Sequence, residues 1–574
     1  MIVYADQFGV KPGKGHDNTL AVISALEYCR QIEQAELVFP KGEYHFYPDR
    51  AIEKQLFISN HDQEGLRRIV FWISHMEHFT IDGQGSAFIF HGPVIPFTME
   101  ESRHIVVKNI VIDWEQPMFA QGTVIRTDAD SFDIRLPSDR PYRLEQNRLH
   151  FEFGKWERVW GMNEFDHQTK APAYQSGDRF GWRRILDTHA EEVEAGVVTF
   201  RGDLRYIPQV GNTIALRFGR RENPAFFINE GAHIRLDSIC IHHAPGMGVI
   251  AQKCDSIDLH QVEVKLRKDS GRIVTATADA THFVYCRGKI HIDHCLFENQ
   301  LDDPCNIHGI YGKIAEKLRD DQLLIELPHF MAKGIKIAES GDELAFVSRE
   351  SLQAYSSARV KNVNYLNKDY MIITFDQPLS EDICLSDVVE NLSWAPDVTI
   401  AHNIIRSNRA RGFLLTTSGN ILLENNKINV PGSGIKISGD ANSWFESGAV
   451  KQLTIRHNEF IDCNYCCPDW GRAVIDIDPE IDHPEQVEGY YHRNITIEHN
   501  RFVTFDTGLV YGLSVDGFTF AHNVIENSNT YEPHHVMRYP IELTACKNIT
   551  IADNHFATGN LTVASVNGRE IELS

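Results

Sequence analysis

Three aspartates are the residues whose type and spacing best suit chemistry. Asp302 and Asp303 are adjacent in the run LDDPCNIHG, and Asp279 lies 23 residues before Asp302, in TADATHF. Carboxyls held close together raise one another's proton affinity, so one can stay protonated while another stays charged. Glycoside hydrolysis needs that combination, because an acid protonates the leaving oxygen while a base activates water, roughly 6.5–9.5 Å apart in inverting enzymes. One coil of a repeat plus side-chain reach is compatible with that separation.

An isolated Asp-Asp pair is more often a solvated or helix-capping turn, so the case depends on a repeat that brings Asp279 close. The pattern apolar-x-x-Asn-x-apolar occurs six times, and its shortest step is 23 residues, the step from Asp279 to Asp302. The central asparagines are Asn403, Asn426, Asn458, Asn500, Asn523 and Asn554. Looser copies occur at 107–112, 236–241, 259–264 and 292–297. The repeat therefore spans most of the chain.

The repeat predicts an all-β fold, a parallel β-helix. Each copy alternates β-branched or aromatic residues beside a turn-forming Asn, and a 23-residue step leaves no room for a helix of three turns. Stacked coils at about 4.8 Å can align the asparagines in a ladder at a bend. The LxxLxL ladder of leucine-rich repeats and the WD signature of propellers are both missing from the sequence. If Asp302 and Asp303 straddle a bend, both can point outward.

Two segments interrupt the repeat and divide the chain into five parts. In these segments, runs of alternating apolar and polar residues are separated by turns that contain Pro and Gly, and the Asn pattern is missing. This predicts two inserted antiparallel β domains. The parts are 1–120 (cap and first coils), 121–225 (first insertion), 226–309 (coils with the aspartates), 310–395 (second insertion) and 396–574 (last coils). A helix at 19–31, capped by Asp17 or Asn18, would cover the end of the solenoid.

Composition narrows the class of protein. The chain has 574 residues with 56 Lys+Arg against 79 Asp+Glu, a net charge of −23, which disfavours a nucleic-acid binder. Hydrophobic residues make up 42%, enough for a large core, and no apolar run is long enough for a membrane span. The 11 cysteines lack the regularity of a disulfide framework. Cys463, Cys466 and Cys467 cluster, but without a second ligand pair they favour packing or a local disulfide over a metal site.

Several runs around the aspartates resemble glycoside hydrolase family 110. They are ATADATHF and ENQLDDPCNIHG, with HHAPGMGVIAQ before them and SGDANSWFESGAV after them. The resemblance covers nearly the whole chain. It implies an inverting, exo-acting α-1,3-galactosidase on a right-handed β-helix with inserted β-barrel domains. By the family's pattern, Asp302 is the general acid, while Asp279 and Asp303 hold and deprotonate the water.

The resemblance also implies the partners. The substrate would be a galactose-terminated oligosaccharide or glycan, with no organic cofactor and no catalytic metal. Secretion or a periplasmic location is the natural setting for such an enzyme, although no signal segment is recognised and a leader would have been removed. The sequence does not decide whether linear, fucose-branched or algal galactosides are preferred. It also leaves open whether the protein forms a homo-oligomer.

Other residues near the aspartates are candidates for binding sugar. His308 could bind a hydroxyl or tune Asp302, and in DANSWFE an indole could stack on galactose while acids take its hydroxyls. The candidates are His308, Asp440, Trp444, Glu446 and Arg272. Lys268 is better explained as surface charge, and His242 and His243 as packing or polar bracing.

Two alternative functions remain. A polygalacturonase-like hydrolase or polysaccharide lyase could use the same fold, but a uronate needs cations, and the sequence suggests no compact Arg/Lys group beside Asp302. A calcium-dependent lyase would also need oxygen ligands and an Arg or Lys base. A non-catalytic carbohydrate-binding β-helix would not need three aspartates in register.

Overall fold

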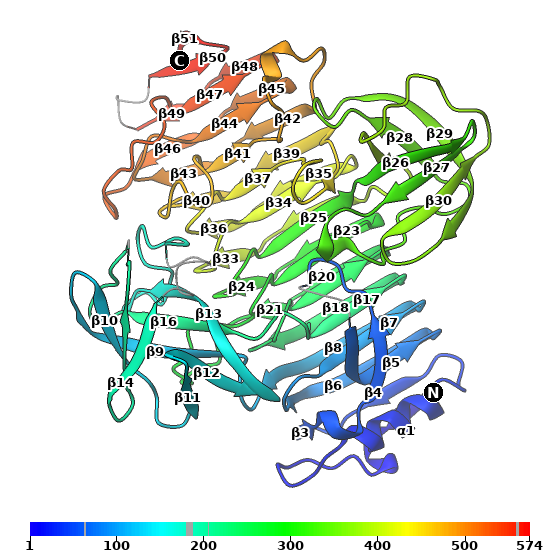
Figure 1. Ribbon diagram of the computed structural model, residues 1–574, viewed down its shortest axis with the longest axis vertical. Coiled ribbons are helices and arrows are strands. Elements are labelled where there is room, and N and C mark those ends of the chain that lie inside the picture. Colours follow the sequence, from blue (N-terminus) through cyan, green and yellow to red (C-terminus); the bar gives the residue numbers. More distant parts are fainter. Residues whose placement is uncertain (62–64, 180–187, 205, 558–561, 574) are drawn as a thin grey trace.

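Most turns of the chain contribute three parallel strands, and the turns stack into an elongated solenoid with the termini at opposite ends (Figure 1). This computed structural model describes residues 1–61, 65–179, 188–204, 206–557 and 562–573. The first row of strands is β1 (Ile2–Tyr4), β2 (Glu36–Val38), β6 (Glu77–Phe90), β8 (Arg103–Trp114), β18 (Ala232–Ile241), β20 (Asp255–His260), β23 (Arg287–Asp293), β32 (Asp397–Ala401), β35 (Asn420–Glu424), β39 (Gln452–Arg456), β42 (His492–Glu498), β45 (Val515–Ala521) and β48 (Lys547–Ala552).

A second row continues the first after a bend, and a third row closes the coil. The second row is β3 (Glu43–Phe46), β21 (Glu263–Val264), β24 (Leu296–Glu298), β33 (Ile404–Arg406), β36 (Lys427–Asn429), β40 (Glu459–Ile461), β43 (Arg501–Thr504), β46 (Val524–Asn527) and β49 (His555–Phe556). The third row is β5 (Gly65–Ser74), β7 (Ile95–Glu100), β17 (Phe226–Asn229), β19 (Val249–Gln252), β22 (Thr281–Val284), β25 (Cys305–Ile310), β34 (Phe413–Thr416), β37 (Ile435–Ile437), β41 (Ile475–Ile477), β44 (Val510–Leu513), β47 (Ile541–Thr544) and β50 (Val563–Val566). The predicted all-β parallel β-helix is confirmed.

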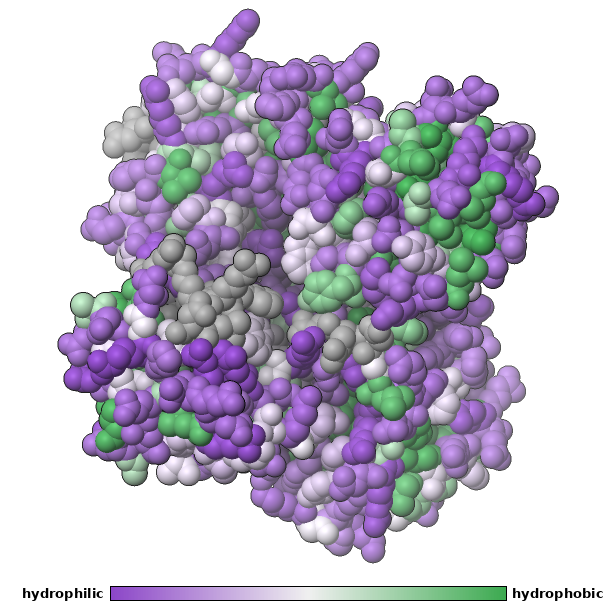
Figure 2. Space-filling model, in the orientation of Figure 1, coloured by the Kyte–Doolittle hydropathy of each residue, from purple (hydrophilic) through white to green (hydrophobic). Residues whose placement is uncertain are grey.

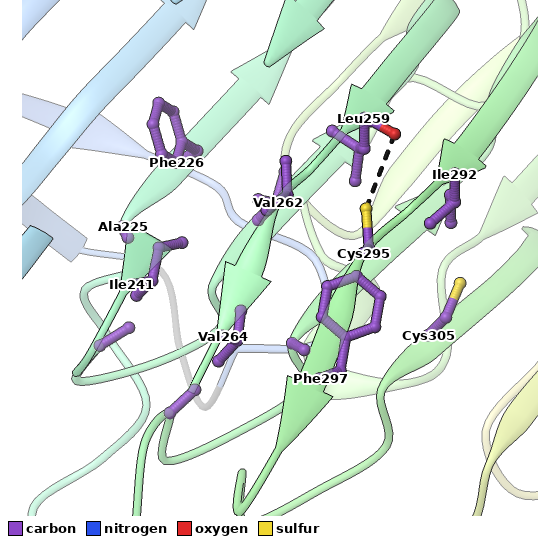
Figure 3. Close-up of a cluster of buried hydrophobic side chains, with 14 of the residues drawn as sticks. Ala225, Phe226, Ile241, Leu259, Val262, Val264, Ile292, Cys295, Phe297 and Cys305 are labelled. Atoms are coloured by element: carbon purple, nitrogen blue, oxygen red, sulfur yellow. Dashed lines mark hydrogen bonds between the residues drawn. The ribbon is translucent and has the colours of Figure 1, made fainter. Parts of the chain in front are cut away.

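The core fills the inside of the coils. Register places like residues above one another, as where Ile400 of β32 lies beside Leu423 of β35 and Leu423 beside Ile455 of β39. All three are fully buried. Figure 3 shows the same stacking nearer the aspartates, with Ile292 and Phe297 pointing into the coil. Burial of these stacked side chains is the main force that holds one coil on the next.

The asparagine ladder runs along the bend between the first and second rows. The backbone N–H and the side-chain amide of Asn403 both donate to Asn426 Oδ1, at 3.0 and 2.9 Å. The same pair of hydrogen bonds links each of the following asparagines to the next: Asn426, Asn458, Asn500, Asn523 and Asn554. The predicted ladder is present, and it satisfies polar groups that the tight bend would otherwise leave buried and unpaired.

A helix covers the N-terminal end of the solenoid, as predicted. Helix α1 (Thr19–Cys29) ends two residues before the predicted Gln31. Asp17 Oδ1 accepts the backbone N–H of Thr19 at 3.0 Å, whereas the Asn18 side chain accepts from Lys11 instead of capping. No helix among the described residues is long and apolar enough to cross a membrane.

Two antiparallel units project from the solenoid on either side of the third row (Figure 1). The first is an eight-stranded sheet of β9 (Phe119–Thr127), β10 (Ser131–Arg135), β11 (Tyr142–Glu145), β12 (Arg148–Phe153), β13 (Lys155–Phe165), β14 (His189–Glu194), β15 (Val197–Arg201) and β16 (Thr213–Phe218). The second is a closed barrel of β26 (Gly312–Arg319), β27 (Gln322–Glu326), β28 (Glu343–Val347), β29 (Ala354–Tyr365), β30 (Tyr370–Phe375) and β31 (Val388–Asn391).

The cysteine cluster packs into the solenoid wall. Cys463, Cys466 and Cys467 are free, buried thiols, so the local disulfide considered above is not formed. The Cys463 thiol donates to the Ile428 carbonyl at 3.5 Å and the Cys466 thiol to the Ala173 carbonyl at 3.3 Å. Burial raises the pKa of Cys466 to about 12, which keeps it a thiol.

Candidate active site

The three aspartates lie together where the chain enters the third row. Asp279 comes two residues before β22, and Asp302 and Asp303 come just before β25. An oxygen of each carboxyl lies within 4.8 Å of an oxygen of the other two. Asp279 and Asp303 are buried, and the Asp302 side chain is 14% exposed. The structure thus brings the predicted catalytic residues into one cluster.

The register of the coil differs from the 23-residue step used to relate Asp279 to Asp302. Thr281 pairs with Cys305, so neighbouring positions in β22 and β25 are 24 residues apart. The Ala280 N–H donates to the Asp303 carbonyl at 3.0 Å, which sets Asp279 level with Asp303. The coil spacing therefore explains why Asp303 lies beside Asp279. Asp302 joins the cluster because the chain bends just before β25.

The aspartates open onto a cavity of about 450 Å³. In Figure 2 the surface is hollowed between the two insertions, and hydrophilic residues border the opening. The lining combines the third row, both insertions and a loop after β37: Asn60, Arg221, Met247, Asp279, His282, Asp302, Asp303, Asn306, Met331, Arg409, Arg411, Leu414, Lys436, Ser438, Asp440, Trp444, Glu446, Asp478 and Glu480. A cavity of this size and polarity suits a terminal sugar residue.

Arginines surround Asp302, contrary to the expectation that no compact cationic group lies beside it. Arg221 Nη1 donates to Asp302 Oδ2 at 3.1 Å, and Arg409 Nη1 donates to Asp302 Oδ1 at 3.2 Å. Arg409 is itself held by Asp178 of the first insertion, through bonds of 2.9 and 2.6 Å. The sequence argument against a uronate substrate therefore loses this support.

Asp303 has an arginine of its own. Arg411 donates to it from the backbone N–H at 2.9 Å, from Nε at 3.3 Å and from Nη2 at 2.9 Å. Arg411 precedes β34, the strand that follows β25 in the third row. This fork fixes the orientation of the Asp303 carboxyl.

The electrostatic environment separates the three carboxyls. Burial, and next the charge of Asp302, raise the pKa of Asp279 well above its usual value. Burial raises the pKa of Asp303 to about 7, with Arg411 opposing the shift. Burial alone would raise the pKa of Asp302 too, but Arg409, Arg221 and Arg411 hold it below its usual value. In the free protein, the negative charge therefore resides first on Asp302, Asp279 retains its proton, and Asp303 loses its own proton only near pH 7.

A pair of histidines continues from Asp279, and the first of them, His282, lines the cavity. His282 Nδ1 lies 2.6 Å from Asp279 Oδ2, and His282 Nε2 lies 2.9 Å from His308 Nε2. His308 Nδ1 lies 2.7 Å from the Gly309 carbonyl, and Nε2 lies 3.5 Å from Glu446 Oε1. Side chains alternate between the two faces along a strand. Phe283, next to His282, and Ile307, next to His308, belong to the core, so both histidine rings lie on the outer face of the third row. His308 thus contacts the site through His282 and Glu446 and does not itself line the cavity.

The predicted sugar-binding loop lies against β25, because Glu446 and Ser447 pair with Ile310 and Gly309. Asp440, Trp444 and Glu446 all line the cavity, and Trp444 is 45% exposed. The Asp440 carboxylate accepts the backbone N–H groups of Asn442 and Ser443, so part of its role is to hold the loop in shape. The Trp444 ring lies 4.7 Å from the His329 ring of the second insertion.

Arg272, the remaining predicted binding residue, lies elsewhere. It donates to Asp113 Oδ1 at 2.6 Å and to the Trp114 carbonyl at 3.0 Å, and it does not line the cavity. His243 braces the main chain between Met118 and Thr275, in the role the sequence favoured for it. Lys268 is likewise outside the cavity.

Several cavity residues escaped the sequence analysis. The second insertion separates Asp303 from Arg411 by 108 positions in the sequence, which hides the fact that they occupy adjacent coils. The detectable signal is the run SNRARGF, which follows the Asn403 repeat as QLDDP follows the preceding one. Asn306 was also missed. It is 6% exposed, lines the cavity, and its Oδ1 has no partner among the described residues, so it can accept a bond from a sugar hydroxyl.

The donor set does not call for a metal. Three carboxyls this close can surround a cation, but Arg221, Arg409 and Arg411 already supply the positive charge that an ion would bring. The arrangement instead provides acid and base groups beside a cavity.

Known sequences match the chain over nearly its full length. It is 33% identical over 560 residues to alpha-1,3-galactosidase B of Bacteroides thetaiotaomicron, covering 96% of this chain and 90% of the relative. It is 33% identical to alpha-1,3-galactosidase A of Shewanella woodyi, again covering 96% and 90%. Alpha-1,3-galactosidase B of Akkermansia muciniphila is 31% identical, covering 96% of this chain and 69% of the relative.

The two insertions match family models of their own. Residues 120–214 match GLAA-B beta-barrel domain I, and residues 322–389 match GLAA-B beta-barrel domain II. Identity above 30% that extends through the solenoid and both insertions establishes the relationship. The chain belongs to the alpha-1,3-galactosidase A/B family.

Proposed function

We propose that this protein is an exo-acting glycoside hydrolase of family 110 that removes terminal α-1,3-linked galactose from oligosaccharides or glycans with inversion. The observation that carries the proposal is the cluster of three buried carboxyls on a sugar-sized cavity in a chain of this family. The cavity needs no organic cofactor for this chemistry.

The reaction is a single displacement with the roles that the resemblance implies. Asp302 gives its proton to the glycosidic oxygen as the C1–O bond breaks. Water attacks C1 from the opposite face and loses a proton to the carboxylate of Asp279 or Asp303. The neighbouring carboxylates stabilise the positive charge that develops on the sugar ring.

The free protein must redistribute protons before it can react this way, because Asp302 starts ionised and Asp303 has a pKa of about 7. One proton moves from Asp303 to the adjacent Asp302, so that an O–H bond breaks on one carboxyl and forms on the other. Arg411 stabilises the carboxylate left on Asp303. The fate of the proton on Asp279 is a separate matter, considered in the next subsection.

The separation of the carboxyls bears on the stereochemistry of the reaction. The closest carboxyl oxygens are within 4.8 Å, which is shorter than the roughly 6.5–9.5 Å that places a water between acid and base. A retaining mechanism, with an aspartate as nucleophile and the two carboxyl groups roughly 5–5.5 Å apart, is the competing candidate.

Time-resolved proton NMR on α-1,3-linked galactobiose tests both activity and stereochemistry. β-Galactose that appears before mutarotation is the expected result. Initial α-galactose would mean retention and a nucleophilic aspartate, and no release from linear or fucose-branched substrates would refute the proposed activity. The same set of substrates ranks the linear and branched galactosides.

The role of each aspartate is separated by leaving-group chemistry. With an aryl α-galactoside whose phenol leaves readily, Asp302→Asn should recover much of its rate, because that phenol needs no proton. Asp279→Asn should stay slow on both substrates, because water still needs a base. Recovery by Asp279→Asn and not by Asp302→Asn would exchange the two roles.

Two alternatives have distinct experimental signatures. A uronate hydrolase or lyase would need cations free to hold the substrate carboxylate, whereas Arg221, Arg409 and Arg411 of the lining are each already bound to Asp302 or Asp303. Cleavage of galacturonan, or activity lost on calcium removal and restored with calcium, would support it. A binding protein would retain galactosides without any release of sugar. A secreted or periplasmic location stays a prediction, tested by fractionation of cells.

A further inference from the structure

The hydrogen bonds around His282 and His308 limit where protons can be. The Gly309 carbonyl can only accept, so His308 Nδ1, 2.7 Å away, carries a hydrogen. The 2.9 Å between the two Nε2 atoms and the 2.6 Å between His282 Nδ1 and Asp279 Oδ2 each require one hydrogen. With fewer, two lone pairs would face each other in a buried site.

These constraints leave three neutral arrangements of the same atoms. One of them, with Asp279 a carboxylate and His282 an imidazolium, is disfavoured because burial lowers the pKa of His282 well below its usual value. The other two keep His282 neutral. In one, Asp279 is a carboxylic acid that donates to His282 Nδ1, and His282 Nε2–H donates to a neutral His308. In the other, Asp279 is a carboxylate, His282 carries its hydrogen on Nδ1, and His308 is an imidazolium. The two arrangements differ only in which atom carries the hydrogen in each of the two shared hydrogen bonds, so the net charge is the same.

We propose that His282 and His308 are positioning residues that share one proton with Asp279, and that transfer of this proton to His308 converts Asp279 into the carboxylate base. In the transfer, the Asp279 O–H bond breaks as His282 Nδ1–H forms. The His282 Nε2–H bond breaks as His308 Nε2–H forms. The inference rests on the proposed hydrolysis and adds to it the means by which a buried base becomes charged.

The surroundings explain why such a device is needed. Burial and Asp302 favour the protonated form of Asp279, which cannot accept a proton from water. Burial, and next His308, hold the pKa of His282 well below its usual value, so that ring conducts a proton without retaining it. His308 is the better final site, because Glu446 Oε1 lies 3.5 Å from its Nε2 and stabilises the imidazolium.

The charged groups that face this chain of residues act in both directions. Asp302 and Glu446 favour a proton on Asp279, and Arg221 and Arg411 oppose it. At His282, Glu446 and Asp302 favour the charged ring while Arg221 and His308 oppose it. His61 lies near enough for the charge of His282 to affect it. Among these, Glu446 is the group that stabilises His308 directly.

The pH dependence of kcat/KM tests the proposal with His308→Gln. Without a proton acceptor, Asp279 ionises only at higher pH, so we expect the acid limb to move up by at least one pH unit. Activity at neutral pH should fall at least tenfold and recover in alkali, with KM within threefold of wild type. A loss of equal size at every pH would mean a purely structural role and would overturn the proposal.

Two further variants make the test specific. Glu446→Gln removes the partner of the imidazolium and should move the acid limb in the same direction by a smaller amount. His492→Gln is the matched control, because His492 is also fully buried but lies in the first row, where its Nδ1 accepts the Val450 N–H. It should leave the acid limb in place, and an equal shift in this variant would refute a specific effect.

A measurement on the unaltered protein avoids any problem of folding and needs no turnover. Nitrogen-15 NMR of the histidine rings reports which nitrogens carry hydrogens. We expect His282 to change tautomer from Nε2–H to Nδ1–H as His308 becomes charged, in one coupled transition. A His308 that stays neutral while His282 keeps one tautomer through the active pH range would overturn the relay, even if galactose release is observed.

Discussion

Two bends of the same coils carry side chains for opposite purposes. At the bend after the first row, coils from Asn403 to Asn554 repeat one residue type, and each amide accepts from the previous one. At the entry to the third row, successive coils present Asp279, then Asp302 and Asp303, then Arg411, whose charges compete. The ladder pairs its buried amide groups with hydrogen-bond partners, whereas the site holds protons on buried carboxyls whose pKa values are shifted by their neighbours.

This difference indicates how stability and function are divided in a β-helix. A repeated position is occupied by the same residue because every coil poses the same problem of an unpaired buried backbone group. A functional position breaks the repeat, because acid, base and cation must differ from one another. Substitutions at the two bends should therefore affect different measurements.

The largest expected effect is at the site. Asp302→Asn should lower kcat on α-1,3-galactobiose by about 10³-fold or more, as expected for loss of a general acid, while binding of galactose is retained. Stopped assays and calorimetric titration provide the two measurements. Asp258→Asn is a matched control, because Asp258 is also paired with an arginine, Arg235, but lies outside the cavity. Unchanged turnover in Asp302→Asn would remove it from the mechanism.

The ladder should respond in stability alone. Asn458→Ala leaves the backbone N–H of Asn426 without an acceptor and its side-chain amide with only the Ile400 carbonyl, and should lower the free energy of unfolding by about 3 kcal/mol. Denaturant unfolding measures this. Asn364→Ala, at an exposed strand position of the barrel, should cost well below 1 kcal/mol. If Asn458→Ala instead lowered kcat in the folded protein, the separation between the two bends would fail.

The two bends should also differ in how their contribution to stability depends on pH. Asp303 has a pKa of about 7 in the fold against 3.8 when unfolded, so between these values the folded state holds the extra proton. Stability from this group is therefore present at low pH and is lost as the pH rises, by about 1.4 kcal/mol per pH unit.

Asp303→Asn removes that dependence, so the unfolding free energy of wild type minus variant should fall steadily from pH 4 to pH 7. The same difference for Asn458→Ala should stay constant, because an amide does not titrate. A flat difference for Asp303→Asn would mean that Arg411 keeps this carboxyl ionised throughout the range.

The smallest effect is expected at the cavity wall. Trp444 is nearly half exposed and contacts His329, so Trp444→Ala should raise KM about three- to tenfold with little change in kcat. Trp156→Ala, in the first insertion, provides a comparison outside the cavity. A fall in kcat without a change in KM would assign Trp444 to the transition state instead of to substrate binding.

Much of the fold could be read from local pattern. The Asn repeat predicted parallel coils and a ladder because each copy forms the same contact with its neighbour in the stack. The register between β22 and β25 was less accessible, since the 23-residue step suggested Asp302 while the strands align Asp279 with Asp303. A bend of one residue, which no repeat length reveals, made the difference.

The sequence by itself determined the solenoid, the ladder and the presence of three aspartates in adjacent coils, because these follow from spacing along the chain. Only the tertiary structure decided which charges meet the aspartates. Arg221 comes from the end of the first insertion, and Arg409 and Arg411 come from beyond the second. It also placed His308 behind His282 and removed Arg272 from the cavity. Charges act through space at a few ångströms, so their partners depend on how insertions fold back, which sequence distance does not encode.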